Sequence, residues 1–274
     1  MAAIVLSVAA VERVRSTAAS DASPIPTFSF GPGTASPSPT PSPTATPSGP
    51  AWPAADERFL TAGSGVLWRA TAGQCGGPAP VVERSTDAGA TWTDVTPTYR
   101  GIAQVISLDA FAGIQAEMVA ATGPNCEVQA LRTFTEGEFW APYPDVLAAS
   151  SYQDPKARSV IITPSGTLEA PCADPRSVRA AGDKVALVCS GKAWLTQAGR
   201  WQELGATDVL AVALTEGDPL VAARADGCRG MNSSAGTSVV TCVPDVDPFA
   251  PTALTTSGAD VLTWSGDTFR SSGP

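Results

Sequence analysis

The chain of 274 residues contains no histidine, so any reaction would rest on carboxylates, tyrosine, arginine, lysine, serine or cysteine. Histidine is the commonest general base, a member of most catalytic triads and a frequent zinc ligand. Its absence therefore excludes those triads and most zinc sites.

Two acidic segments have the composition of cation ligands, namely Asp245-Val246-Asp247 and Asp226-Gly227. A calcium site needs several oxygen ligands that converge at a regular spacing, and neither segment has that spacing. Solvated turns explain both segments better. The sequence therefore predicts no metal site and no cofactor, and it assigns no catalytic residue.

The six cysteines all follow a proline-rich region: Cys75, Cys126, Cys172, Cys189, Cys228 and Cys242. None belongs to a Cys-x-x-Cys pair, which argues against a zinc ribbon or a thioredoxin-type motif. An even number of cysteines in an exported protein favours disulfides, although six cysteines leave fifteen connectivities open. We expect all six to be structural.

The N-terminal part of the chain differs in composition from the rest. Residues 1–19 begin with an apolar run that is shorter than the roughly 20 residues needed to span a bilayer, and the run lacks a basic leading region. We interpret the segment as the remnant of a signal or membrane anchor, with a short frayed helix as the alternative. Residues 20–52 are rich in Pro, Ser and Thr, which predicts a disordered stalk with polyproline II bias.

The rest of the chain, residues 53–274, has the pattern of an all-β domain. Short apolar stretches alternate with Gly, Pro, Asp and Ser turns, and no long amphipathic helical pattern is present. The formal net charge is -9, and an acidic surface repels phosphate backbones, so we expect no nucleic-acid partner.

One turn sequence is distinctive. Residues 85–92 read Ser-Thr-Asp-Ala-Gly-Ala-Thr-Trp and fit the pattern Ser-x-Asp-x-Gly-x-Thr-Trp at every defined position. The segment resembles the Asp-box, or BNR repeat, of sialidases, sortilin-type receptors and photosystem assembly-factor propellers. The resemblance implies a structural turn between the third and fourth strands of a propeller blade, built by Ser85, Asp87, Gly89, Thr91 and Trp92. We find weaker copies at residues 133–140, 195–201 and 263–269.

The resemblance implies an all-β fold, a β-propeller of about five to six four-stranded blades. The expected blades lie near 57–97, 100–145, 146–175, 176–205, 206–249 and 250–274, and the last is expected to be half a blade that pairs with the strands around Phe59. Aligning the repeats favours three sequential disulfides, Cys75–Cys126, Cys172–Cys189 and Cys228–Cys242. In such a repeat, five tryptophans are expected to pack between blades: Trp68, Trp140, Trp194, Trp201 and Trp264.

Two functions are compatible with this resemblance, besides a purely structural, degenerate repeat protein with no small ligand. The first is a non-enzymatic, extracytoplasmic binding or scaffold module at the cell surface, a monomer with an unknown protein or glycan ligand. It would be secreted, or would touch the membrane only through its N-terminal segment. The alternative is a sialidase-like glycoside hydrolase, and the resemblance implies that three arginines would converge with tyrosine and glutamate on one face of the ring. The residues of these types that we consider for that role are Arg58, Arg69, Arg100, Tyr99, Tyr143, Tyr152 and Glu117. The Arg-containing signature of that family is not matched at Arg58-Phe59-Leu60.

Overall fold

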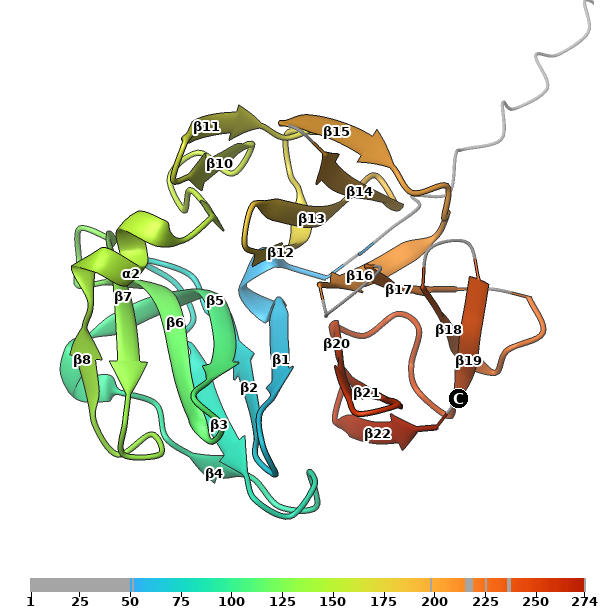
Figure 1. Ribbon diagram of the computed structural model, residues 1–274, viewed down its shortest axis with the longest axis horizontal. Helices are drawn as coiled ribbons and strands as arrows, with labels where there is room; N and C mark the ends of the chain where they lie inside the picture. The colour runs from blue at the N-terminus through green and yellow to red at the C-terminus, as the bar shows by residue number, and fades with distance from the viewer. Residues whose placement is uncertain are drawn as a thin grey trace, which may run out of the picture. The chain divides into compact units, whose positions relative to one another are not determined.

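The computed structural model describes residues 50, 52–197, 199–214, 219–224, 226–235 and 238–273. The apolar segment of residues 1–19 and the predicted stalk up to residue 49 lie outside the described residues. The described part is an all-β ring of six antiparallel sheets, which are the blades of a β-propeller (Figure 1). The predicted fold class is therefore confirmed.

Four of the blades have four strands each. Blade 1 comprises β1 (Arg58–Ala62), β2 (Leu67–Thr71), β3 (Val81–Ser85) and β4 (Thr93–Asp94). Blade 2 comprises β5 (Ile102–Phe111), β6 (Gln115–Thr122), β7 (Glu127–Thr133) and β8 (Trp140–Pro142). Blade 4 comprises β12 (Arg176–Ala181), β13 (Lys184–Cys189), β14 (Lys192–Gln197) and β15 (Arg200–Glu203). Blade 5 comprises β16 (Val209–Ala213), β17 (Leu220–Ala223), β18 (Gly230–Ala235) and β19 (Ser238–Pro244).

The other two blades have three strands, which corrects the prediction of four. Blade 3 comprises β9 (Tyr152–Gln153), β10 (Val160–Thr163) and β11 (Gly166–Glu169), and blade 6 comprises β20 (Thr252–Ser257), β21 (Asp260–Ser265) and β22 (Thr268–Ser272). Three short helices complete the described elements: η1 (Ala54–Asp56), η2 (Thr98–Arg100) and α2 (Pro144–Ala149). Among the described residues no helix is long and apolar enough to cross a membrane.

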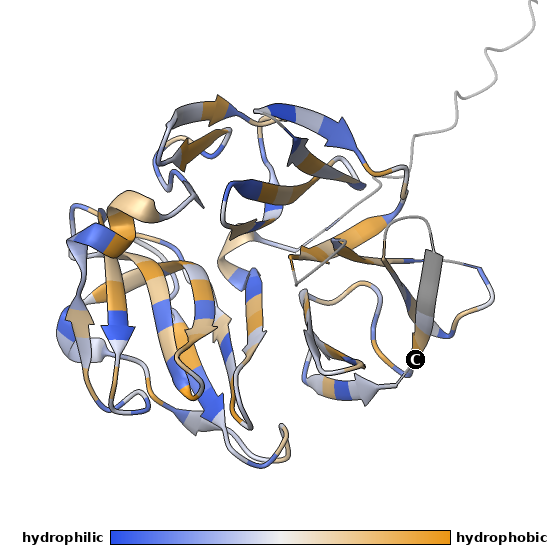
Figure 2. Ribbon diagram, viewed as in Figure 1, coloured by the Kyte–Doolittle hydropathy of each residue, from blue (hydrophilic) through white to orange (hydrophobic). Residues whose placement is uncertain are grey.

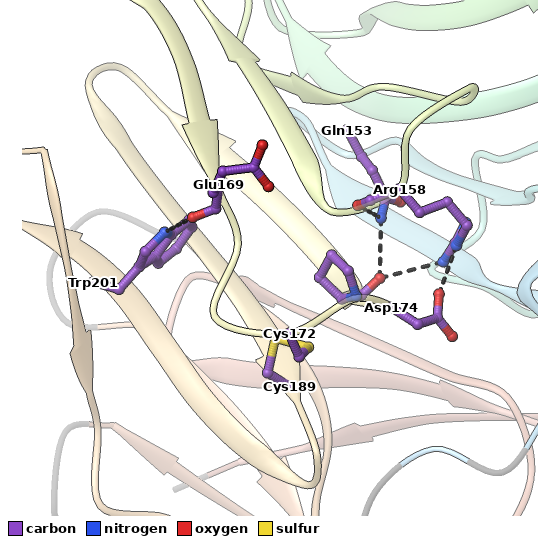
Figure 3. The surroundings of a disulfide bond; sticks show 8 residues. Gln153, Arg158, Glu169, Cys172, Asp174, Cys189 and Trp201 are labelled. Atoms are coloured by element: carbon purple, nitrogen blue, oxygen red, sulfur yellow. Dashed lines mark hydrogen bonds and ion pairs between the residues drawn. A yellow bond between two sulfur atoms is a disulfide. The ribbon is translucent and has the colours of Figure 1, made fainter.

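Blade 3 lacks a fourth strand for a local reason. After β11 the chain runs through residues 170–175, which include Pro171 and Pro175, and proline cannot donate a hydrogen bond to a strand ladder. Other contacts hold this stretch in place. Cys172 is joined to Cys189 of β13, and the Trp201 indole donates to the carbonyl of Glu169 at 2.7 Å (Figure 3).

The ring closes through its innermost strands. β1, β5, β9, β12, β16 and β20 contact one another in this order, and β20 contacts β1. In the described residues β1 is hydrogen-bonded as a strand only to β2, so the expected pairing of the last segment with the strands around Phe59 is wrong. Side chains join the two blades instead, since Arg58 donates to the carbonyl of Gly266 and its guanidinium lies 3.9 Å from the ring centroid of Trp264.

The core consists of apolar layers between neighbouring blades. Strands alternate apolar and polar residues wherever one face remains near solvent (Figure 2), whereas all five residues of β16 are buried. Trp68 and Trp140 meet edge to face between blades 1 and 2, with ring centroids 6.0 Å apart. Trp264 is also buried, while Trp194 and Trp201 are half-buried and pack against the cluster between blades 3 and 4. All five tryptophans thus contribute to packing.

The six cysteines form three disulfides with the expected partners: Cys75–Cys126, Cys172–Cys189 and Cys228–Cys242. The first joins blades 1 and 2, and the second joins the loop after blade 3 to blade 4. Each disulfide contributes roughly 2–4 kcal/mol to stability, because it reduces the conformational entropy of the unfolded chain. Because such bonds persist in oxidising compartments, they indicate an extracytoplasmic environment.

Candidate functional site

The turn of residues 85–92 connects β3 to β4, the third and fourth strands of blade 1. Its two polar side chains each accept a hydrogen bond from a backbone N–H four residues later: Ser85 Oγ from Gly89 at 2.9 Å, and Asp87 Oδ1 from Thr91 at 2.8 Å. The Thr91 hydroxyl adds a bond of 2.6 Å to the same carboxylate. The hydrogen bonds that the Asp87 carboxylate accepts, first those from Thr91 and then that from Ser85, lower its pKa to about 2.

The weaker copy in blade 2 has the same turn geometry with different side chains. Thr133 Oγ1 accepts from the N–H of Gly137 at 2.8 Å, and Thr135 Oγ1 accepts from the N–H of Phe139 at 2.8 Å. In both turns the third and fourth loop positions have positive φ, at 57° and 88° in blade 1 and at 57° and 96° in blade 2. A threonine hydroxyl therefore replaces the aspartate carboxylate without changing the turn.

Each of these turns packs against the preceding blade. A Cβ atom on Gly89 would lie 2.3 Å from the Phe269 ring of blade 6, and one on Gly137 would lie 2.8 Å from Cβ of Val95 in blade 1. Trp92 meets the Phe269 ring edge to face, with centroids 5.6 Å apart. Ser85 is buried and Gly89 and Trp92 pack against blade 6, while the Asp87 side chain is exposed but bonded within the turn, which supports a structural role for these residues.

The two remaining copies are not turns of this kind. Residues 195–201 form a hairpin in which Gln197 of β14 pairs with Arg200 of β15, so only two residues make the turn. Residues 263–269 form the hairpin between β21 and β22, the second and third strands of blade 6. The Gly-Arg-Trp and Gly-Asp-Thr-Phe sequences there reflect tight hairpins, which also favour glycine.

Side chains and the segment that leads into β1 fill the centre of the ring. Arg176 of β12 donates to the Glu57 carboxylate at 2.9 Å and to the carbonyls of Trp52 and Pro53 at 2.9 and 3.1 Å. Glu57 also accepts from the N–H of Ser177 at 2.8 Å. Trp52, placed by the sequence at the end of the linker, is buried against blade 5. The ordered domain therefore includes Trp52.

A second arginine of β12 also reaches across the centre. Arg179 donates to the carbonyl of Arg58, and its guanidinium lies 4.6 Å from the ring centroid of Phe59. A cavity beside these arginine contacts, with Glu57, Phe59 and Arg179 in its wall, has a volume of only about 20 Å³, roughly enough for one water molecule. Arg176 and Arg179 thus tie β12 to the segment around β1.

The seven residues that the glycosidase hypothesis requires to converge occupy four separate places. Arg58 and Arg69 stack on Trp264, at 3.9 and 4.6 Å. The other groups are Tyr99 with Arg100 at the carbonyl of Trp140, Glu117 with Tyr143 around Arg132, and Tyr152 in β9. The contacts in the described residues thus do not bring three arginines together with tyrosine and glutamate. Nor do these residues contain any group of three or more acidic or cysteine side chains that could hold a metal ion.

One face of blade 2 carries charged side chains from three neighbouring strands. Asp109 of β5, Glu117 of β6 and Arg132 of β7 are neighbours in the strand register and share one face of the sheet. The opposite face, with Leu108, Met118 and Leu131, is buried against blade 1. Since β9 of blade 3 has only two residues, it covers the shared face incompletely.

We define the blade 2 cleft as the cavity whose wall includes Glu117, Arg132 and Asp145, together with the adjoining side chains of Asp109, Phe111, Phe134 and Tyr143. Arg132 lies at its centre, with Nε and Nη2 both 2.6 Å from Oε2 of Glu117. The guanidinium lies 4.7 Å from the ring centroid of Phe111 and 5.5 Å from that of Tyr143. The Phe134 ring, 55% exposed, packs edge to face on Phe111 at 5.3 Å. The cleft thus combines stacked aromatic rings with an ion pair.

A cavity of about 280 Å³ extends from this ion pair under α2, and its wall includes Glu117, Arg132 and Asp145. Asp109 lies next to Glu117 in the register. Water reaches the Asp109 side chain, but the surrounding protein still desolvates the carboxylate and, together with the charge of Glu117, raises its pKa to about 6. The positive charge of Arg179 lowers the pKa of Asp109 and so offsets part of this rise.

Sequence reasoning named Glu117 and Tyr143 but not Asp109, Phe111, Arg132 or Phe134. The available signal was weak: a charged residue inside each of two strands that are otherwise apolar, as in Ala-Glu-Met-Val and Ala-Leu-Arg-Thr. The register that places these charges side by side is a property of the folded sheet.

The ring and its turns define the class of this protein as a six-bladed β-propeller. No family model matches the chain, and no curated protein matches it. Solved structures similar to it include YCF48 bound to a D1 peptide, with 16% identity, 75% of this chain and 73% of that chain covered, and a TM-score of 0.40. The Hadza microbial sialidase Hz136 has 11% identity over 75% of this chain and 49% of that chain, with a TM-score of 0.33. A Bacteroides thetaiotaomicron protein with a provisional assignment as a glycosidase has 8% identity, coverages of 77% and 82%, and a TM-score of 0.38.

Proposed function

We propose that this protein is a non-enzymatic binding or scaffold module of the cell surface and that the blade 2 cleft holds its ligand. The observation that carries the proposal is the Arg132–Glu117 ion pair, which is stacked between Phe111 and Tyr143 on a partly uncovered sheet face. Aromatic and arginine side chains are enriched where proteins bind their partners.

Exposed aromatic residues next to the cleft favour a protein partner. Among the described residues five large apolar side chains are exposed, and three of them lie around β8: Tyr99, Phe134 and Phe139. Tyr99 bonds the backbone of Trp140 in β8, and the two phenylalanines belong to the turn that precedes it. Grouped apolar side chains of this kind mark interaction surfaces more often than isolated ones do.

The rest of the chain suits a module of this kind. The disulfides indicate an extracytoplasmic domain, and we propose that the part of the 20–52 linker that precedes Trp52 forms a stalk. We further propose that residues 1–19 derive from a signal or anchor and that the domain acts as a monomer. The alternative, a sialidase-like glycoside hydrolase, receives no support, because Arg58 and Arg69 share Trp264 while Arg100 lies apart at the carbonyl of Trp140.

The test is retention of cell-envelope proteins by the immobilised full chain, compared between wild type and Phe134→Ala. We expect specific proteins to be retained by the wild type and lost from the variant, because truncation of Phe134 removes an exposed wall of the cleft. Phe249→Ala is the matched control, since Phe249 is an exposed phenylalanine on the opposite side of the ring. Equal retention by all three proteins, or hydrolysis of sialoside substrates by the wild type, would contradict the proposal.

A further inference from the structure

We infer that the blade 2 cleft takes a basic side chain, arginine or lysine, from an extended polypeptide segment of the partner. This inference rests on the proposed function and adds the chemistry of the ligand to it. Three features of the cleft support it: its unoccupied hydrogen-bond acceptors, its aromatic walls and its size.

The acceptors in the cleft outnumber the donors. Both contacting nitrogens of Arg132 bind Oε2 of Glu117, so Oε1 has no hydrogen bond among the described residues. Asp109 and Asp145 likewise make no side-chain hydrogen bond within the described part of the chain. The second nearby cation, Arg179, already donates to the carbonyls of Arg58 and Val178. A ligand group with several N–H donors and a positive charge complements this arrangement.

The aromatic walls favour a cation over a neutral group. The faces of Phe111 and Tyr143 already hold one guanidinium, that of Arg132, at cation–π distances. The Phe134 ring lies beside them, packed against both Phe111 and Tyr143, and more than half of it is open to solvent. A second cation entering the cleft therefore meets an aromatic surface next to free carboxylate oxygens.

The size of the cleft favours a single side chain. Its cavity of about 280 Å³ lies at the lower limit of pockets that hold complete small ligands, which are about 300–1,000 Å³. The aromatic residues around β8 extend the surface outside the cavity, so flanking residues of a peptide would have apolar contacts there. The net charge of -9 adds long-range attraction for a basic segment.

The inference is tested by titrating the isotope-labelled full chain with a synthetic peptide, acetyl-Gly-Phe-Arg-Phe-Gly-amide, in an NMR experiment. The control peptide has citrulline in place of arginine, which keeps the shape and removes the charge. We expect saturable shifts in β6, β7 and α2 with the arginine peptide and about tenfold weaker binding of the citrulline peptide. Binding should weaken further as the salt concentration rises.

Two variants of the protein test which carboxylates accept hydrogen bonds from the basic side chain of the peptide. We expect Glu117→Gln to weaken binding of the arginine peptide about tenfold and Asp145→Asn to weaken this binding several-fold. Asp145 is exposed at the start of α2 and pairs with nothing in the described residues, so its substitution leaves the fold intact. The control is Glu83→Gln, because Glu83 also pairs with a cross-strand arginine, Arg69, but lies outside the cleft.

The outcomes separate this inference from the proposed function. Equal binding of the two peptides, or full binding by Glu117→Gln and Asp145→Asn, would overturn the inference. Saturable shifts at the same positions with sialyllactose and none with the arginine peptide would overturn it in favour of a glycan. In either case, loss of envelope proteins from Phe134→Ala would still support binding through the cleft.

Discussion

Gly89 of blade 1 lies against the ring of Phe269 in blade 6, so closely that a Cβ atom at position 89 would be 2.3 Å from Cε1 of that ring. The two residues are 180 positions apart in the sequence, yet their contact decides how the first and last blades fit together. Gly137 has the equivalent relationship with Val95, one blade further on. The turns therefore fix the spacing between blades as well as the hairpins in which they lie.

Gly89→Ala is expected to lower stability by about 2–4 kcal/mol, since it adds a steric clash to the strain of a positive φ. Thermal unfolding of the purified variant measures the effect. Gly65→Ala is the matched control, because Gly65 also has positive φ but no atom within 4 Å of its added Cβ. The interpretation fails if both variants unfold at the same temperature.

Asp87→Ala is expected to destabilise blade 1 without affecting peptide binding in the blade 2 cleft. Asp87→Thr should lose less stability, because Thr135 makes the equivalent backbone bond in blade 2. The folded pKa of about 2 is below the ordinary value of 3.8. The contribution of Asp87 is therefore present above pH 4 and is lost as the pH falls toward 2. Urea unfolding between pH 2 and pH 6 should show this dependence in the wild type and a weaker one in Asp87→Ala.

Arg176→Ala is expected to cost about 3–5 kcal/mol, because it leaves the Glu57 carboxylate buried without its partner. It also removes the bonds to the carbonyls of Trp52 and Pro53. Arg229→Ala is the control, since the Arg229–Asp245 pair is 3.9 Å apart and largely exposed, and such pairs contribute at most about 1 kcal/mol. Denaturant midpoints that shift equally in the two variants would show that the centre of the ring is not held by Arg176.

Asp109→Asn is expected to change the pH dependence of stability between about pH 4 and pH 6. The folded pKa of about 6 is above the ordinary 3.8, so the folded state binds the proton more tightly than the unfolded state. The stabilisation that comes from this tighter proton binding by Asp109 is present below pH 4 and is lost as the pH rises through 6. Melting temperatures of the two proteins across this range provide the measurement, and parallel curves would exclude a raised pKa at Asp109.

Local patterns in the sequence predicted the blades well. The boundaries near 57–97, 100–145, 176–205 and 206–249 enclose the four-stranded sheets, because turn residues and short apolar runs act over a few positions. Because such patterns span only a few residues, they also produced two weak matches to the turn sequence that are ordinary hairpins. A Gly followed by an aromatic residue also occurs in two-residue hairpins, as at residues 195–201 and 263–269.

By itself, the sequence predicted a β-propeller and paired cysteines, and the structure confirms both. Only the tertiary structure decided which side chains meet around the segment before β1 and on the face of blade 2. Arg176 reaches Glu57 from 119 residues away, and Asp109, Glu117 and Arg132 meet because three strands align in register. The short blade 3 then leaves that face partly uncovered. Such contacts depend on ring closure and strand register, which bring together residues that no local spacing relates.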